Sequence, residues 1–156
     1  MTVHFVLGPL GALDLDRAAA LHAECFAPLG ERPWTRQDLA ELLASPGVAG
    51  MMLAAAGGDA GFVLWRVAAD EAELLTIAVR PLHRRQGAGR RLLMAAVDHA
   101  RGAGARSLYL EVGTDNPAAR SLYDAEGFRA VGNRPSYYRR GAGPAVDGIV
   151  MRLTLN

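Results

Sequence analysis

Residues 71–91, EAELLTIAVRPLHRRQGAGRR, decide the fold of this chain, because they join a buried strand to a strong helix through a basic, glycine-containing loop. The first nine of these residues predict a strand, Glu71–Val79. The second half of this strand is apolar on both faces, which is typical of a central strand that is covered on both sides. Pro81 ends the strand, since proline cannot donate a hydrogen bond to a sheet.

The helix that follows is predicted over Gly89–Ala100. Apolar residues at spacings of three and four form one stripe along it, namely Leu92, Leu93, Ala96, Val97 and Ala100. Five arginines gather near its start: Arg80, Arg84, Arg85, Arg90 and Arg91. Cations are normally unfavourable at the positive end of a helix dipole, and no Asp or Glu lies between positions 74 and 97. A bound anion at the helix start would explain the cluster, and a solvated basic turn is the alternative.

Three other uses of such a loop are not supported. A Walker A loop needs a lysine, and the chain has none. A Rossmann fingerprint needs a third glycine where Leu92 stands. Nucleic-acid binding is not indicated, because the net charge is only +1 and no stripe of basic and aromatic residues is present.

The remaining pattern adds strands and helices on both sides of this segment. Strands are expected at Thr2–Leu7, Gly50–Ala56, Ala60–Ala68, Ser107–Val112, Phe128–Val131 and Ile149–Leu155. Helices are expected at Leu15–Phe26, from the Thr35–Asp38 capping box to about Ser45, and from Asn116-Pro117 to Gly127. The order β-α-α-β-β-β-α-β-α-β-β predicts a mixed α/β sheet with helices on both faces.

Composition bounds the class of protein. The chain has 156 residues, which fits a single domain over 1–156. All 17 basic residues are arginine, so no lysine can form a Schiff base or clamp a phosphate. No apolar run reaches the roughly 20 residues of a membrane span, and the start lacks the pattern of a signal peptide. We therefore expect a cytoplasmic protein that binds neither membrane nor nucleic acid.

At this point the sequence resembles a known superfamily. Arg84-x-x-Gly87-x-Gly89 after Leu-Thr-Ile-Ala-Val is similar to the acyl-CoA pyrophosphate loop of the GNAT acetyltransferases, and the order of elements also agrees. Within that superfamily, Glu71–Gly127 resembles the RimI-type enzymes, which acetylate the N-terminal alanine of a ribosomal protein. The matching pieces are EAELLTIAV, RRQGAGRRLL, LEV, DNPAARSLYDAEGF and PSYYRR.

The resemblance implies about seven strands and a splayed central parallel pair, at 71–79 and 107–113, that holds acetyl-CoA. The residues it assigns to the cofactor are Ile77, Ala78 and Val79 for the pantetheine arm, Arg84, Arg85, Gln86, Gly87, Ala88, Gly89 and Arg90 for the pyrophosphate, and Asn116 beyond the second strand. Asn116 is equally well explained as a helix cap.

The resemblance also supplies a catalytic pair. Glu111 lies on the strand face opposite Leu108, Leu110 and Val112, and its position implies a general base; a structural ion pair with an arginine is the alternative. Tyr123 takes the position of the general acid, since a phenol with a pKa near 10 can protonate a departing thiolate. The alternative is a tyrosine of the hydrophobic core.

Weaker candidates concern the acceptor amine. Trp34, Glu73, Tyr137 and Tyr138 are expected to line its site, although the three aromatic residues could simply pack loops and Glu73 could form an edge ion pair. Cys25 follows a helical apolar spacing and is expected to be buried. His4, His22, His83 and His99 show no ligand spacing, so no metal is proposed.

Two departures from the family pattern leave the acceptor open. Gly113 stands where the family usually has an arginine or a similar polar residue, and the loop Arg139–Asp147 is long and glycine-rich. The acceptor could be a protein N-terminus, possibly of a ribosomal protein, or a small amine. A non-catalytic acyl-CoA-binding module is a third reading. A monomer or weak dimer is expected.

Overall fold

The structure, a computed structural model, describes residues 3–155. Its elements follow the expected order: β1 Phe5–Pro9, α1 Leu15–Phe26, α2 Arg36–Ala44, β2 Val48–Ala55, β3 Gly58–Ala68, β4 Glu71–Val79, α3 Ala88–Gly102, β5 Ser107–Gly113, α4 Pro117–Ala125, β6 Arg129–Tyr138 and β7 Val146–Thr154. The bounds of α1 and β4 agree with the sequence prediction at both ends. The first predicted strand began at Thr2, which lies outside the described residues.

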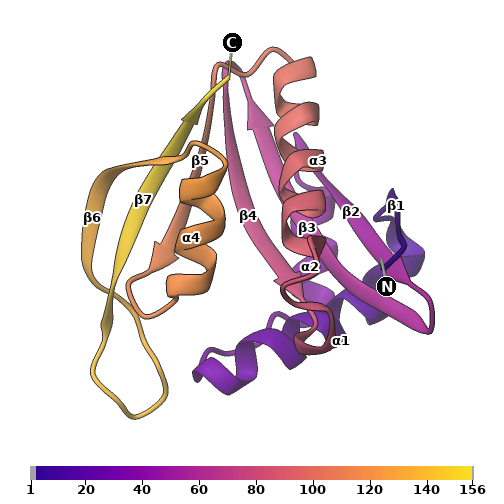
Figure 1. The fold of residues 1–156 in the computed structure, drawn as a ribbon, viewed down its shortest axis with the longest axis horizontal. Helices are drawn as coiled ribbons and strands as arrows, with labels where there is room; N and C mark the ends of the chain where they lie inside the picture. Colours follow the sequence, from indigo (N-terminus) through magenta and orange to yellow (C-terminus); the bar gives the residue numbers. More distant parts are fainter. Residues whose placement is uncertain (1–2, 156) are drawn as a thin grey trace.

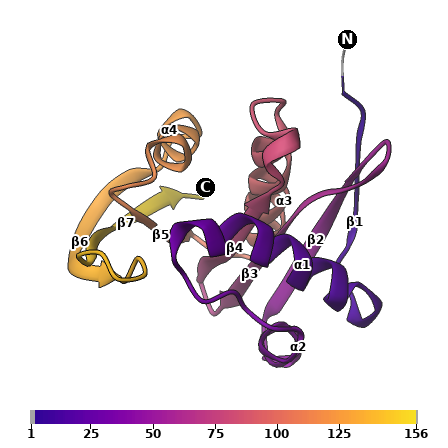
Figure 2. The ribbon, with the colours of Figure 1, turned by 90° about the horizontal axis from the view of Figure 1, so that it is seen from below.

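The described strands form one seven-stranded sheet in the order β1-β2-β3-β4-β5-β7-β6, which confirms the mixed α/β class. Neighbouring strands are antiparallel except for β4 and β5, which are parallel. Helices α3 and α4 lie on one face of the sheet, whereas α1 and α2 lie on the other (Figures 1 and 2). The sheet is therefore covered on both faces around β3 and β4.

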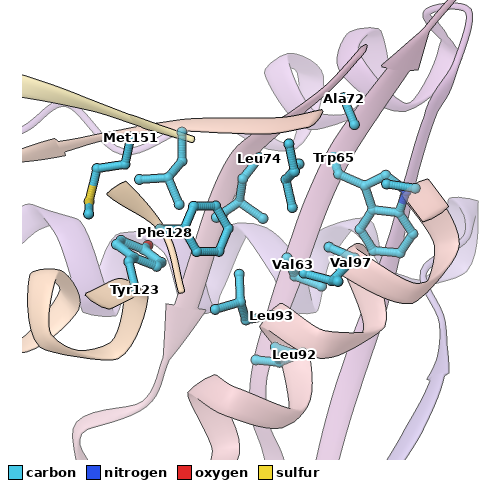
Figure 3. Close-up of a cluster of buried hydrophobic side chains, with 14 of the residues drawn as sticks. Val63, Trp65, Ala72, Leu74, Leu92, Leu93, Val97, Tyr123, Phe128 and Met151 are labelled. Atoms are coloured by element: carbon cyan, nitrogen blue, oxygen red, sulfur yellow. The ribbon is translucent and has the colours of Figure 1, made fainter. Parts of the chain in front are cut away.

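Two hydrophobic cores hold the helices to the sheet. On the first face, Leu93 and Val97 of α3 and Tyr123 of α4 pack with Leu74 and Met151 from the strands (Figure 3). On the opposite face, the second core joins α1 and α2 to β2, β3 and β4; it contains Leu21, Cys25, Leu39, Phe62, Leu64 and Ala78. The apolar stripe predicted along α3 is buried throughout.

The central parallel pair separates soon after it begins. Strands β4 and β5 are in register only from Glu71 opposite Ser107 to Glu73 opposite Tyr109. In the antiparallel pairing with β3, Trp65 opposes Leu74 and Leu64 opposes Thr76, so Leu75 is an extra, bulged residue. A bulge bends its strand and increases the local twist. Because this one follows the last residue paired with β5, it accounts for the departure of β4 from its neighbour.

The helix starts follow the local sequence signals. The hydroxyl of Thr35 accepts a hydrogen bond from the Asp38 backbone N–H, and the Asp38 carboxylate accepts one from the Thr35 N–H, as the capping box predicts. At α4 the Asn116 side chain accepts from the Ala119 N–H at 3.2 Å, so its role as a cap is confirmed.

The last hairpin is longer than the sequence indicated. Strand β6 continues to Tyr138 instead of ending at Val131, and β7 begins at Val146 instead of Ile149. Gly132 and Pro135 interrupt the alternation that reveals a strand, and the register shifts twice along this pair. Ser136 has a positive φ of 53°, at the second of these irregularities. Bulges of this kind hide a strand from pattern analysis.

Candidate active site

A single continuous cleft of about 1490 Å³ lies where β4 and β5 separate. It extends from the start of α3 to the loops before α2 and after β6. Small-molecule pockets usually occupy about 300–1,000 Å³, so this cleft has room for more than one small ligand. Nearly all the residues predicted to bind cofactor or acceptor line it.

One end of the cleft is the start of α3. Its N-cap, Gly87, has a φ of 85°, and the preceding Arg85 has a φ of 63°. The backbone N–H of Arg91 donates to the Gly87 carbonyl at 3.0 Å and makes the first turn of the helix. The N–H groups before it are those that a helix start leaves available for an anion.

The arginines around this helix start are not equivalent. Arg80 forms an ion pair with Glu24 at 3.2 Å, and Arg90 forms one with Glu126 at 2.5 Å. Two of the five arginines gathered at this helix start therefore have carboxylate partners from distant parts of the chain. Arg84 donates to the Val79 carbonyl at 3.0 Å, and both Arg84 and Arg85 line the cleft.

Gly87 and Gly89 of this loop are required for different physical reasons. Gly87 adopts a left-handed backbone conformation that favours glycine, whereas a Cβ added there would meet nothing within 4 Å. Gly89 has ordinary helical geometry, but a Cβ there would lie 3.2 Å from the Leu122 side chain on α4. The close approach of α3 to α4 thus depends on Gly89.

The edge of β4 forms one wall of the cleft. Beyond Glu73 this strand has no β5 partner, so its backbone groups on that side face the cleft. An extended chain could pair with such a strand edge. The carbonyl of Val79 already accepts hydrogen bonds from Cys25 Sγ and Arg84 Nε, and Ala78 pairs with Phe62 of β3. Among the three predicted residues, Ile77 therefore has the carbonyl that is left for a ligand.

Glu111 lies on the opposite wall, with its side chain 27% exposed. One carboxylate oxygen accepts a hydrogen bond of 2.6 Å from Arg134 Nη1, and the Arg134 guanidinium lies 4.0 Å from the centre of the Tyr137 ring. Glu111 therefore does form the ion pair with an arginine that was the alternative interpretation of this residue. It does not remove Glu111 from the cleft, since the residue lines it as well.

Tyr123 lies in the first core and also lines the cleft. Its ring packs against Phe128 at 5.7 Å, and the residue is only 4% exposed. Burial, with a smaller contribution from Tyr138, raises the pKa of the Tyr123 phenol well above its usual value. The Tyr123 phenol is therefore protonated at neutral pH, and its raised pKa makes it a weaker acid toward a departing thiolate than an ordinary phenol would be.

The predicted acceptor residues gather at the other end of the cleft. Trp34, Glu73, Tyr137 and Tyr138 all line it. Tyr137 and Tyr138 meet edge to face, with ring centres 5.0 Å apart. Burial, followed by the nearby charges of Glu111 and Glu31, raises the pKa of Tyr138 to about 12.

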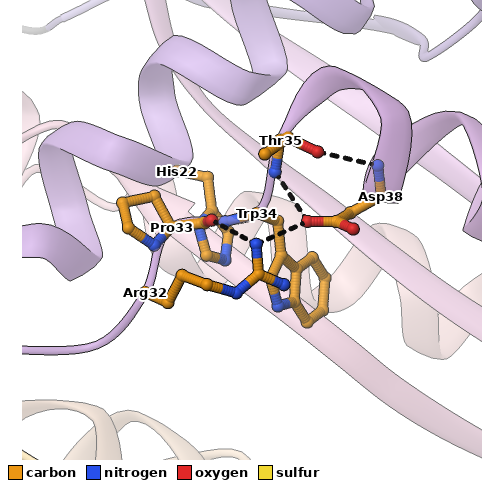
Figure 4. Close-up of polar contacts among 6 residues, drawn as sticks. All are labelled: His22, Arg32, Pro33, Trp34, Thr35 and Asp38. Carbon is orange, nitrogen blue, oxygen red and sulfur yellow. Dashed lines mark hydrogen bonds and ion pairs between the residues drawn. The ribbon is translucent and has the colours of Figure 1, made fainter.

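His22 is a residue of this end that the sequence analysis did not select. Its ring stacks on Trp34 with centres 4.8 Å apart, and its Nδ1 accepts a hydrogen bond from the Trp34 backbone N–H at 3.0 Å (Figure 4). Burial, assisted by Arg32, lowers the pKa of His22 to about 4. The His22 imidazole is therefore neutral at neutral pH, and its stacking and hydrogen bond hold Trp34 in place. Its place on the apolar face of α1 was the available signal.

Within residues 3–155, no group of three or more His, Cys, Asp or Glu side chains is placed to hold a metal ion. None of the helices in this part of the chain is long and apolar enough to cross a membrane.

The fold and cleft define a class of protein, and comparisons with known proteins identify it. A family model described as "Acetyltransferase (GNAT) family" matches residues 15–128, so the chain belongs to that family. It is 39% identical over 137 residues to the N-alpha-acetyltransferase RimI of Mycobacterium tuberculosis, covering 85% of this chain and 84% of the relative.

Two further similarities involve Escherichia coli. The chain is 39% identical over 104 residues to the [ribosomal protein bS18]-alanine N-acetyltransferase of strain K12, covering 64% of this chain and 67% of the relative. The crystal structure of the ribosomal-protein-S18-alanine N-acetyltransferase from this organism matches with a TM-score of 0.88 and 32% identity, covering 98% of this chain and 95% of that one. The chain is thus an N-acetyltransferase, and its resemblance to the RimI-type enzymes is confirmed.

Proposed function

We propose that this enzyme transfers the acetyl group of acetyl-CoA directly to the N-terminal α-amine of a protein. The observation that carries the proposal is the cleft between β4 and β5. It combines a helix start suited to phosphate, a strand edge and a carboxylate–phenol pair in one continuous space. Two relatives with 39% identity are named an N-alpha-acetyltransferase and a ribosomal-protein alanine N-acetyltransferase.

The residues present fit acetyl-CoA in chemical type. The backbone N–H groups of Arg85–Arg90, with the side chains of Arg84 and Arg85, would hold the pyrophosphate. The backbone of Ile77 and the N–H of Val79, which point away from β3, would pair with the pantetheine arm, and Asn116 lies at the opposite wall beside α4. When bound, acetyl-CoA supplies a thioester whose carbonyl carbon accepts the amine.

Glu111 and Tyr123 would move the two protons that the transfer requires. Glu111 takes a proton from the acceptor ammonium, because only the neutral amine is a nucleophile. Tyr123 gives its proton to the departing thiolate. Cys25 is not a candidate for a covalent intermediate, since burial raises the pKa of its thiol and Sγ already donates to the Val79 carbonyl at 3.3 Å.

The acceptor we propose is a polypeptide that begins with alanine, by analogy with the ribosomal-protein enzymes, and such an acceptor would meet this protein in the cytoplasm. Carboxylates at the acceptor end, Glu31 and Glu73 as well as Glu111, suit an incoming ammonium group.

A thiol-release assay with acetyl-CoA tests the proposal. We expect turnover with short peptides that begin with Ala, weaker turnover with Ser- or Met-starting peptides, and little with polyamines or free amino acids. Turnover only with small amines would contradict the peptide acceptor, and release of no thiol with any acceptor would contradict the transfer itself.

A further inference from the structure

The sheet face opposite α4 is open over β5, β7 and β6. The second core, which joins α1 and α2 to the sheet, contains residues of β2, β3 and β4 but, within residues 3–155, none of β5, β6 or β7. In Figure 2, α4 lies on one side of β6 and β7, and no helix of the described chain lies on their other side. The side chains on that side, the open face, are therefore accessible to a partner.

Strand alternation and register show which side chains share the open face. Leu108 and Leu110 belong to the first core, so Tyr109 between them points the other way. Tyr109 is opposite Arg152 of β7, and Arg152 is opposite Arg129 of β6. Because residues directly opposite in a sheet lie on the same face, one tyrosine and two arginines form a row across the open face.

The two arginines of this row face each other without a carboxylate. Both are exposed, and within residues 3–155 neither forms an ion pair. Like charges directly opposite each other on neighbouring strands are destabilising. On the other side of Tyr109 the charges balance, since Glu73 of β4 is opposite Arg66 of β3. The uncompensated positive charge of the row therefore lies over β7 and β6.

A carboxylate side chain fits this charge better than a nucleic acid does. Glu73 and Glu111 lie on the same face, directly beside Tyr109 and two residues along its strand, and would repel a phosphate chain that crossed the sheet. The net charge of the chain is only +1, whereas nucleic-acid-binding domains carry extended basic surfaces. Two guanidinium groups side by side can instead bind one acidic side chain through charge-assisted hydrogen bonds.

The row lies within reach of an acceptor whose amine is at Glu111. Glu111 and Tyr109 are two residues apart on one face of β5, about 7 Å at the usual rise per residue. Arg129 lies two strands beyond Tyr109, about 10 Å at the usual strand spacing. The diagonal of about 12 Å corresponds to roughly three or four residues of extended chain. An acidic side chain near the fourth or fifth residue of the acceptor would therefore reach the two arginines.

We propose that Arg129 and Arg152 form a docking surface for an acidic side chain of the acceptor polypeptide, at about the fourth or fifth residue from the α-amine. Tyr109, which is half-buried, supplies an apolar wall beside them. The surface selects among acceptors by the residues that follow the first one, and it does not touch the reacting atoms. The inference rests on the proposed peptide acceptor.

Three Ala-starting peptides that differ only at the fourth and fifth residues test the proposal. With two glutamates at these positions we expect a KM about tenfold lower than with two glutamines, and with two lysines a higher KM than with glutamines. The kcat should be nearly the same for all three, because the contact is equally strong in the ground state and the transition state. Raising the salt from about 0.05 to about 0.5 M should remove most of the difference, since ions screen exposed charges.

Charge reversal makes the test specific for this surface. Arg152→Glu should abolish the glutamate preference, because the new carboxylate can pair with Arg129, and Arg129→Glu combined with Arg152→Glu should reverse it in favour of the lysine peptide. Arg101→Glu makes the same charge change on α3, on the other face of the sheet, where Arg101 pairs with Asp98. This control should keep the wild-type preference. The KM for acetyl-CoA should stay within twofold in all these variants.

Arg152→Gln removes the charge with little change in size and keeps the inference testable if the double variant does not fold. It should reduce the glutamate preference at least threefold. A wild-type KM that differs less than twofold between the glutamate and glutamine peptides would overturn the inference. Competition of a single-stranded RNA with the peptides, lost in Arg152→Glu and without any glutamate preference, would overturn it in favour of nucleic acid.

A binding measurement separates failure of the docking surface from failure of the proposed function. No turnover of any of the three peptides would refute the proposed function. Fluorescence anisotropy of the labelled glutamate peptide still reports on the surface in that case, and its affinity should fall about tenfold in Arg152→Glu. Equal affinity in the wild type and in folded Arg152→Glu would refute the docking surface alone.

Discussion

The two ends of the cleft are built from different parts of the chain. At the end proposed to bind the cofactor, the key groups are backbone: the N–H groups at the start of α3, the left-handed Gly87 and the open edge of β4. At the acceptor end they are side chains brought together from distant positions. Arg140, for example, contacts Glu31 across 109 residues of sequence.

This difference decides what each end can tolerate. A backbone site depends on conformation, so it is sensitive to changes at glycine and largely indifferent to neighbouring side chains. A side-chain site depends on partners, and it can change its acceptor without altering the sheet. Glu111 lies between the two ends, and a change there should affect the reaction of both substrates.

Glu111→Gln should have the largest effect on turnover. Glutamine keeps the shape of the side chain and can still accept a hydrogen bond from Arg134, but it cannot take a proton. We expect kcat/KM for the peptide to fall on the order of 10²–10⁴-fold at neutral pH. The loss should shrink at higher pH, where more of the amine is already neutral. Steady-state rates from pH 6.5 to 9.5 measure it.

The matched control is Glu41→Gln, which changes an exposed carboxylate of α2 that is hydrogen-bonded to Gln37. It should leave both rate and pH profile unchanged. If Glu111→Gln is folded and still turns over at the wild-type rate, the base lies elsewhere, and Glu73 would be the next carboxylate to test.

Tyr123→Phe should lower kcat on the order of 10²-fold, at the low end of the range for acid–base catalysis. The KM for acetyl-CoA should stay nearly constant, because the proton matters when the thiolate departs. Tyr138→Phe is the comparison, since this second, half-buried phenol lines the same cleft. A larger fall in Tyr138→Phe than in Tyr123→Phe would reassign the acid.

The sequence predicted the strand, loop and helix around the start of α3 well, because the signals for them are local. A strand, a proline, two glycines and an amphipathic helix lie within about thirty residues, and each constrains only its neighbours. The bounds of β4 and the Asn116 cap were correct for the same reason. The ion pairs of Arg80 and Arg90 could not be predicted, because their partners, Glu24 and Glu126, lie far away in the sequence.

The acceptor end was predicted only in outline. Trp34, Tyr137 and Tyr138 were selected by resemblance, and they do line one cleft. The bulge at Leu75, which opens the cleft, leaves no mark in a strand that is apolar on both faces. The full length of β6 and the partners of Arg140 depend on register shifts and contacts between loops, which no spacing of residues along the chain encodes.

His22 offers a test of the acceptor end by pH. The pKa of His22 is about 4 in the folded protein and near 6.5 when unfolded, so the unfolded state binds more protons between these values. Stability is therefore lost as the pH falls from 6.5 toward 4, by about 2 kcal/mol between pH 7 and pH 5. Urea unfolding at the two pH values measures this loss.

His22→Asn supplies the comparison, because its amide oxygen can still accept from the Trp34 N–H but does not titrate. The difference in unfolding free energy between pH 7 and pH 5 should shrink by about 2 kcal/mol in this variant. An equal pH dependence in the two proteins would mean that His22 does not carry the acid sensitivity.

The smallest expected effect concerns Gly87, at the end of the cleft proposed to bind the cofactor. Comparing Gly87→Asp with Gly87→Asn separates the effect of negative charge from the effect of side-chain size. Aspartate and asparagine have nearly the same size at Gly87, where a Cβ meets nothing within 4 Å, and both face the same left-handed φ of 85°. Only aspartate adds a negative charge where the phosphates would lie. The KM for acetyl-CoA should therefore be about tenfold higher in Gly87→Asp than in Gly87→Asn, a difference of about 1.4 kcal/mol. The KM for the peptide should be the same in both variants. Equal values for acetyl-CoA would place the pyrophosphate away from this helix start, and a matching change in the peptide constant would show that the two ends of the cleft are not independent.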